Sequence, residues 1–241
     1  MRLRKVIPIA AVLPALIAIS ACSGESADSG EKDAKVSANS TPLEGKSTAD
    51  AEAERVGAMA PQALEKATLS GKENGFEAKK VAKADVEAGR DMKADKTECQ
   101  PLASLAGGYT HIPAVVVEHR ALEPIETTNA TVGSMWLASH SERNAKKVLA
   151  EVRTSLKECP DGFKTLGLTY KSVKPVKAPA LGDEAVGYRI TNVVGKQKVS
   201  MTYTLVRKDG VVAVFYGVNM LTPENSAIPD SVIRGQIEKL G

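Results

Sequence analysis

The segment from Lys198 to Asn219, KVSMTYTLVRKDGVVAVFYGVN, constrains the fold of this chain more than any other. Its first half alternates between large apolar residues and Ser or Thr, which is typical of a strand with one buried face. Asp209-Gly210 is a pair that favours a tight hairpin turn. With that turn, the register pairs four sets of cross-strand neighbours: Leu205 with Val214, Tyr203 with Tyr216, Thr204 with Phe215, and Thr202 with Gly217.

A helix is predicted in the segment that runs from Ser139 to Cys159. Ser139, followed three residues later by Glu142, is the pattern of a capping box. One apolar stripe follows at spacings of three and four residues, and Pro160 ends it. The stripe consists of Ala145, Val148, Leu149, Val152, Leu156 and Cys159. A second helix is predicted from about Asp230 to Leu240.

Further strands are predicted at residues 114–120, 131–138, 169–173 and 185–193. Strands in such number, joined by a hairpin and accompanied by few helices, favour the α+β class. We expect a mainly antiparallel, twisted sheet with helices packed on one face, in a single domain that one disulfide staples.

The three cysteines have separate expected roles. Cys22 lies near the N-terminus, and Cys99 and Cys159 lie far from it. Disulfides persist in exported proteins, so we expect Cys99 and Cys159 to be bonded, although two free thiols are the alternative. No metal site is expected, because neither cysteine lies in a CxxC pair and the three histidines lack ligand spacing.

The N-terminus has the features of an export signal. A basic start, MRLRK, precedes a short apolar run that two prolines interrupt. This pattern predicts a signal peptide over residues 1–21 and is too short for a comfortable membrane span. Ile19-Ser20-Ala21-Cys22 resembles the lipobox of bacterial lipoproteins, in which the cysteine is acylated. The resemblance implies lipidation of Cys22, anchoring to the cell membrane and a location on its extracytoplasmic face; an ordinary signal peptide is the alternative.

Residues 22–60 are predicted to form the lipidated cysteine and a flexible polar tether. From Ser23 to Ala60 there is no aromatic residue, and small and charged residues dominate. Such a composition cannot bury enough apolar surface to offset chain entropy. We expect only partial helix in the Ala- and Glu-rich stretch that begins near Ser47. The domain is expected to occupy residues 61–241.

Several function classes find no support in the sequence. The net charge is only +3, and lysines alternate with acids, so we expect no nucleic-acid partner. The chain has no nucleophile elbow, phosphate loop, zinc-protease motif or EF-hand. We therefore expect no cofactor and no catalytic residue.

A candidate ligand site follows from the hairpin register. Thr202, Thr204 and Phe215 share the face that the predicted core does not use, and Gly217 would leave a depression beside Phe215. Two residues on other strands, Trp136 and Arg189, are expected to border this surface. The alternative is that the segment from Pro61 to Cys99 covers this face, that Trp136 is a core residue and that Arg189 is a solvated one.

The order of several segments resembles a known family. The segments are ECQPLASLAGG, MWLASHSE, SLKECPDGF, APALGDEAVGYR and VRKDGVVAVFYG, followed by a closing helix. This order is similar to the PknH-like sensor-domain family of actinobacteria, found in receptor kinases and in free lipoproteins. The resemblance covers roughly residues 67–241. It implies an α+β sheet with a cleft, no known catalytic activity and a ligand that is generally unidentified.

The expected function is a membrane-anchored, extracytoplasmic lipoprotein that binds a small molecule, a lipid or a cell-envelope protein without catalysis. A carrier of lipid or glycolipid is the alternative, and an enzyme without a recognisable motif is the third. A continuous apolar cavity would favour the carrier. A buried carboxylate or histidine with a shifted pKa in a cleft would favour the enzyme.

Overall fold

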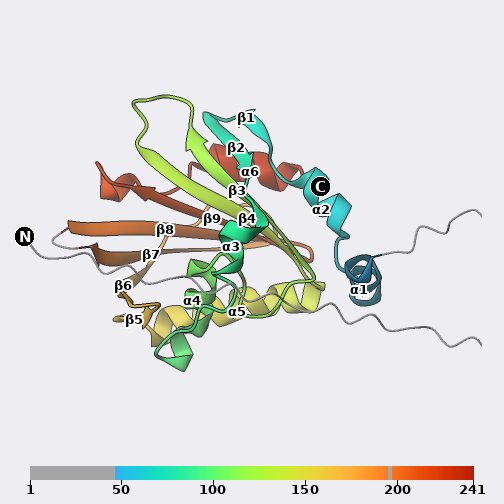
Figure 1. Cartoon of the computed structure of the whole chain (residues 1–241), viewed down its shortest axis with the longest axis horizontal. Helices are drawn as coiled ribbons and strands as arrows, with labels where there is room; N and C mark the ends of the chain where they lie inside the picture. Colours follow the sequence, from blue (N-terminus) through green and yellow to red (C-terminus); the bar gives the residue numbers. More distant parts are fainter. Residues whose placement is uncertain (1–46, 195–196) are drawn as a thin grey trace, which may run out of the picture. The chain divides into compact units, whose positions relative to one another are not determined.

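The computed structural model describes residues 47–194 and 197–241, which form an α+β fold around one antiparallel sheet (Figure 1). The strand order is β1-β2-β3-β4-β9-β8-β7-β6-β5. The strands are β1 (Gly71–Glu73), β2 (Phe76–Lys80), β3 (Val116–Pro124), β4 (Thr131–Ser139), β5 (Gly162–Thr165), β6 (Leu168–Val176), β7 (Glu184–Val194), β8 (Gln197–Lys208) and β9 (Val211–Asn219). The predicted fold class is confirmed.

Six α-helices and two short 3-10 helices accompany the sheet within the described residues. They are α1 (Thr48–Val56), α2 (Pro61–Ala67), α3 (Lys83–Glu87), η1 (Thr97–Cys99), α4 (Gln100–Ala106), α5 (Glu142–Glu158), η2 (Pro223–Asn225) and α6 (Asp230–Glu238). None of the helices in this part of the chain combines the length and the apolar character that crossing a bilayer requires.

The hairpin of β8 and β9 has the register that the sequence predicts. All four predicted pairs, from Leu205 with Val214 to Thr202 with Gly217, are present. The turn consists of Asp209 and Gly210, and Asp209 has a φ of 50°, a left-handed conformation that aspartate tolerates better than most residues.

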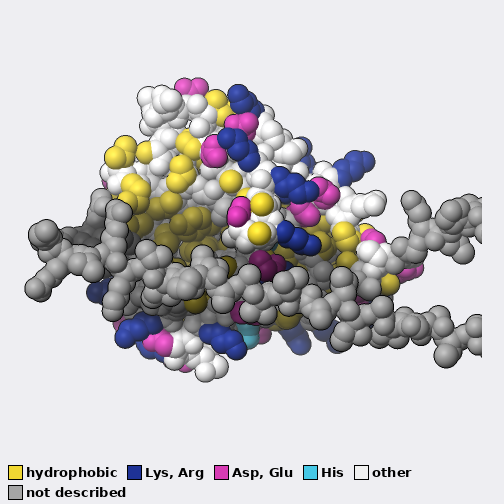
Figure 2. All heavy atoms as spheres, viewed as in Figure 1, with side chains coloured by type: hydrophobic (Ala, Val, Ile, Leu, Met, Phe, Trp, Pro, Cys, Tyr) yellow, Lys and Arg dark blue, Asp and Glu magenta, His cyan; other side chains and the backbone are white. Residues whose placement is uncertain are grey.

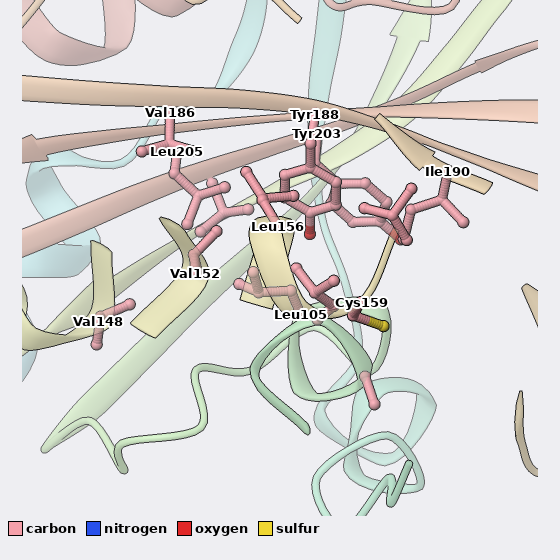
Figure 3. Packing of buried hydrophobic residues seen from close by; sticks show 14 of the residues in the cluster. Leu105, Val148, Val152, Leu156, Cys159, Val186, Tyr188, Ile190, Tyr203 and Leu205 are labelled. Atoms are coloured by element: carbon pink, nitrogen blue, oxygen red, sulfur yellow. The ribbon is translucent and has the colours of Figure 1, made fainter. Parts of the chain in front are cut away.

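One face of the sheet packs against α4 and α5. Val148, Val152 and Leu156 project from α5 toward Val186 and Leu205 of the sheet (Figure 3). The predicted apolar stripe of α5 is therefore confirmed, but Ser141 rather than Ser139 caps the helix: its side chain accepts a hydrogen bond from the Asn144 N–H. Ser139 is instead the last residue of β4.

The second face is covered as well, so the prediction of helices on one face is wrong. Leu64 of α2 and Ile233 of α6 are fully buried in a second core with Phe215, Leu137 and other apolar residues of the sheet. Strand β9 is apolar at nearly every position, and β4 is apolar from Met135 to Ala138, so both faces of the sheet need cover there.

A disulfide joins Cys99 and Cys159, as predicted, with a sequence separation of 60 and 5.5 Å between their Cα atoms. Cys159 follows the last residue of α5, and Cys99 immediately precedes α4. The bond therefore fixes the two helices of the first face to each other.

The N-terminal boundary of the structured region precedes the predicted one at residue 61. Helix α1 lies within the expected tether, in the stretch whose composition predicts partial helix. Ser47 caps it, and Gly57 ends it with a φ of 69°. The Ser139 hydroxyl also donates a hydrogen bond of 2.9 Å to the Met59 carbonyl, which attaches this segment to the end of β4. Cys22 and the predicted signal peptide lie outside the described residues.

Candidate functional site

A cavity of about 400 Å³ opens on the face of the sheet that carries α4 and α5. We call it the aromatic cleft. Its floor is formed by residues of four strands: Trp136, Tyr170, Met201, Tyr203 and Tyr216. Its walls are the segment 81–92, which includes α3, and the end of α4 at residues 105–108. Figure 2 shows hydrophobic side chains gathered in a hollow on this face.

The sheet register brings the floor residues together. Ser134 of β4 pairs with Tyr216 of β9, Tyr216 pairs with Tyr203 of β8, and Tyr203 pairs with Tyr188 of β7. Paired residues in adjacent antiparallel strands project from the same face. Three tyrosines therefore stand in one row across the sheet, and Trp136 lies two positions beyond Ser134 on β4.

The aromatic rings of the floor contact one another and two neighbouring rings, those of Tyr188 and His119. Tyr188 and Tyr203 are stacked at 4.9 Å between ring centroids (Figure 3), and Tyr203 and Tyr216 are 5.1 Å apart. Trp136 stacks with His119 at 6.2 Å. Packing of this kind fixes the rings before a ligand arrives, which lowers the entropic cost of binding.

One hydrogen-bond donor at the floor lacks a partner. Trp136 is 2% exposed, and its Nε1 has no hydrogen-bond partner in the described structure; the hydroxyl of Tyr188 has none either, but Tyr188 is fully buried and does not line the cavity. Burial raises the pKa of Tyr203 and of Tyr216, so both phenols stay protonated at neutral pH. Since a buried donor without a partner is costly, the Trp136 N–H favours a ligand that accepts a hydrogen bond.

His119 is a wall of the cleft rather than a base next to a nucleophile. Its Nε2 lies 2.8 Å from the Gly108 carbonyl, to which a neutral ring donates a hydrogen bond. Burial lowers the pKa of this ring, so it is uncharged at neutral pH. Among the described residues, no hydrogen bond joins His119 to a Ser, Thr or Cys side chain.

The Arg120 side chain lies on the opposite face of the sheet, although the residue lines the cavity. Arg120 is 4% exposed and pairs in register with Met135 of the second core, whereas its neighbour His119 pairs with Trp136. The Arg120 guanidinium donates hydrogen bonds to the carbonyls of Leu69 and His119 and pairs with Glu118 at 3.2 Å. The cleft is therefore apolar and uncharged over its floor, and Asp85 of α3 adds a carboxylate at the wall.

Close backbone contact joins the two walls. A Cβ placed on Gly89 would lie 2.1 Å from the Gly107 carbonyl oxygen, and the reverse distance is also 2.1 Å. Only glycine fits at both positions, because such a contact excludes any side chain. We call residues 81–92 the strap; its helix α3 has no buried residue.

A second cavity of about 470 Å³ shares Met92 with the aromatic cleft and is lined by Arg90, Gln100 and Tyr109 among others. Several of its polar groups already have partners. The Gln100 amide donates to the Met92 carbonyl and to Ser104, and the Arg90 guanidinium lies 4.5 Å from the centre of the Tyr109 ring. The buried, unpartnered N–H of Trp136 therefore favours the aromatic cleft as the ligand site.

The predicted open surface on the other face is wrong. Thr202, Thr204 and Phe215 are 2%, 6% and 1% exposed. The expected depression at Gly217 is filled, since a Cβ there would lie 2.2 Å from the Ser226 carbonyl oxygen. The Thr202 hydroxyl bonds to the Ser226 hydroxyl at 2.7 Å, so the segment after β9 lies across this face.

The structure places the other two predicted site residues, Arg189 and Trp136, on opposite faces of the sheet. Arg189 does lie on the Thr202 face, where it donates to the Thr202 hydroxyl and to the Glu224 carbonyl. Trp136 faces the opposite side and lines the aromatic cleft. The sequence did place Tyr203 and Tyr216 on one face, but their alternation with Leu205 and Val214 indicated core and gave no sign of a cavity.

The described residues hold no group of three or more His, Cys, Asp and Glu side chains that could bind a metal ion.

Comparison with known proteins gives little. No family model matches the chain, and no curated protein matches it. A similar solved structure is the crystal structure of the extracellular domain of PknH from Mycobacterium tuberculosis, at 9% identity and a TM-score of 0.47. The similarity covers 76% of this chain and 95% of that one, and it concerns the fold at most.

Proposed function

We propose that this protein is a non-catalytic binding module, held at the extracytoplasmic face of the cell membrane by a lipid on Cys22, whose ligand occupies the aromatic cleft. One observation carries the proposal: a preformed cavity of about 400 Å³ has an aromatic floor and a buried indole N–H without a partner. Ligand sites typically combine apolar walls with a few polar groups that orient the ligand.

The disulfide supports the location, because such bonds persist in oxidising compartments outside the cytoplasm. The sequence Ile19-Ser20-Ala21-Cys22 supports the anchor. The neutral His119, whose Nε2 bonds to a backbone carbonyl, supports binding without proton transfer.

Filling the cleft should abolish binding. Ser134 lies on the floor between Trp136 and Tyr216, and Ser134→Leu adds a branched apolar side chain to the cavity. Native mass spectrometry of protein purified from its own host should show a bound small molecule on the unmodified chain and none on this variant.

Ser70→Leu is the matched control, because Ser70 is exposed and lies outside the cleft. It should retain the ligand. The proposal fails if Ser134→Leu, at an unchanged melting temperature, carries the same bound mass as the control.

Removing the anchor should release the protein. Cys22→Ala leaves no sulfur for acylation, and stable anchoring needs more than one lipid chain. Fractionation of the cells should find the variant in the medium, or uncleaved with its signal peptide attached. A variant that is still processed and membrane-bound would contradict the role of Cys22.

The alternative of a lipid carrier is favoured by the walls of the cleft, which present Val81, Val86, Met92 and Leu105 to the cavity. A carrier and a sensor-like module would share this site. They would differ in the event after binding, since a carrier delivers its ligand and a sensor passes on a signal.

A further inference from the structure

The large apolar side chains that the described structure leaves exposed lie at one end of the sheet. They are Ile125, Val132, Leu166, Leu168, Met220 and Leu221. Strand pairing shows that all six residues lie at the same end of the strands. The start of β4 pairs with the end of β9 (Thr131 with Asn219), and the start of β6 pairs with the last residues of β7. We call this group the apolar end. In Figure 1 it is the end at which β9 runs into η2 and the β3–β4 connection turns.

Scattered apolar residues on a surface are ordinary, but their concentration at one place indicates a contact surface. The described residues offer no comparable exposed side chain at the opposite end of the strands. Two of the six, Leu221 and Leu166, are 82% and 70% exposed, so they contribute little to the stability of the domain.

Leu166 occupies a backbone conformation that disfavours it. The turn between β5 and β6 consists of Leu166 and Gly167, with φ values of 46° and 76°. Asn or Gly is the usual residue at the first of these positions. A leucine that is both strained and exposed at a turn is more consistent with a contact outside the chain than with folding.

Leu221 is held in place by a buried polar residue. The side-chain oxygen of Asn219 accepts hydrogen bonds from the N–H groups of Leu221 and Thr222, at 3.0 and 2.7 Å. Its amide nitrogen donates to the hydroxyl of Thr131 at 3.0 Å. The neighbouring strand therefore fixes the loop that presents Leu221.

The apolar end continues into the aromatic cleft. Trp136, Ser134 and Val132 occupy every second position of β4 and so share one face. Steps of two residues are about 7 Å long, so this row extends about 14 Å from the indole to Val132. Met201, which lines the cleft, lies in the same row of the sheet as Val218 and the exposed Val132.

We propose that the apolar end contacts the lipid bilayer and that an acyl chain of a membrane lipid enters the aromatic cleft from it, with its ester or carboxyl oxygen accepting a hydrogen bond at the cleft floor. The inference rests on the proposed function and names the ligand of that site. Residues 22–46 span at most roughly 80 Å when extended. The longest strand, β8, is about 40 Å long. A chain lipidated at Cys22 is therefore long enough for the apolar end to reach the bilayer.

The test uses Trp136, which is the only tryptophan of the chain. The mature lipidated protein is reconstituted in phosphatidylcholine vesicles whose acyl chains carry bromine, a short-range quencher. Trp136 fluorescence should be largely lost relative to vesicles without bromine. The double variant Leu166→Asn/Leu221→Asn should recover most of the fluorescence, because it removes the two most exposed apolar side chains.

Ala63→Asn is the matched control, since Ala63 is exposed on α2 and lies outside the apolar end. It should be quenched like the unmodified chain. The double variant should melt no lower than the unmodified chain, because Asn suits the left-handed conformation at position 166. Unquenched Trp136 in the unmodified protein, or equal quenching in the double variant, overturns the inference. If a bound molecule is then still displaced by Ser134→Leu, the proposed function stands with a different ligand.

Discussion

Replacing Cys159 with Ser should lower the free energy of unfolding by about 2–5 kcal/mol. The bond closes a loop of 60 residues, which restricts the unfolded chain strongly. Both cysteines are buried, at 0% and 2% exposure, so the variant also leaves a hydroxyl and a thiol in an apolar core. Urea unfolding followed by circular dichroism measures the loss.

The double variant Cys99→Ala/Cys159→Ala separates the two contributions, because it removes the bond without placing a new hydroxyl in the core. It should be more stable than Cys159→Ser and less stable than the unmodified, oxidised protein. If the unmodified protein unfolds at the same urea concentration with and without reductant, the disulfide does not stabilise the fold.

Replacing Arg207 with Met should cost about 3 kcal/mol, the lower part of the range for breaking a buried ion pair. Arg207 is 6% exposed and donates to Asp183 and Glu184, both at 2.7 Å. The variant keeps the apolar stem but leaves two partly buried carboxylates without this partner. Arg153→Met is the matched control: Arg153 also binds Glu184, but its side chain is 43% exposed, and exposed pairs contribute at most about 1 kcal/mol.

The same variant should shift acid unfolding to higher pH. Burial would raise the pKa of Glu184, but hydrogen bonds from Arg207 and Arg153 outweigh it and hold the pKa below its usual range. The stability from this group is thus complete above the ordinary Glu pKa of about 4.3 and is lost as the pH falls through the lower folded value. Without Arg207, the pKa of Glu184 in the folded state rises, so stability is lost at a higher pH. Equal acid midpoints for Arg207→Met and the unmodified protein would contradict this account.

Local patterns predicted the parts of the fold that local chemistry determines. Asp209-Gly210 and the flanking alternation define the register of β8 and β9, because a turn of two residues leaves a single pairing. The spacing of apolar residues from Ala145 to Leu156 defines α5. The predicted export and an even number of remaining cysteines were enough to predict the pairing of Cys99 with Cys159.

The second covered face and the cleft could not be predicted in this way. Phe215 and Ala213 indicated a mixed surface, whereas α2 and α6, from opposite ends of the sequence, both pack on it. The cleft exists because the strap touches the end of α4 at Gly89 and Gly107, and a cavity remains between the strap and the ring row of Tyr203 and Tyr216. No periodic pattern marks these long-range placements, and the short strands β1, β2 and β5 carry too few residues to show alternation.

The close contact between Gly89 and Gly107 allows the height of the aromatic cleft to change independently of the sheet. A methyl group at Gly89 would move the strap away from α4, because the Gly107 carbonyl lies only 2.1 Å from the added carbon. Helix α3 is exposed and contributes no buried side chain, so such a displacement leaves both cores intact. Substitutions in the strap can therefore change the height of the cleft while the sheet, which supplies its aromatic floor, stays unchanged. Among relatives that share this sheet, we expect substitutions of these two glycines to be the first changes that accompany a different ligand size.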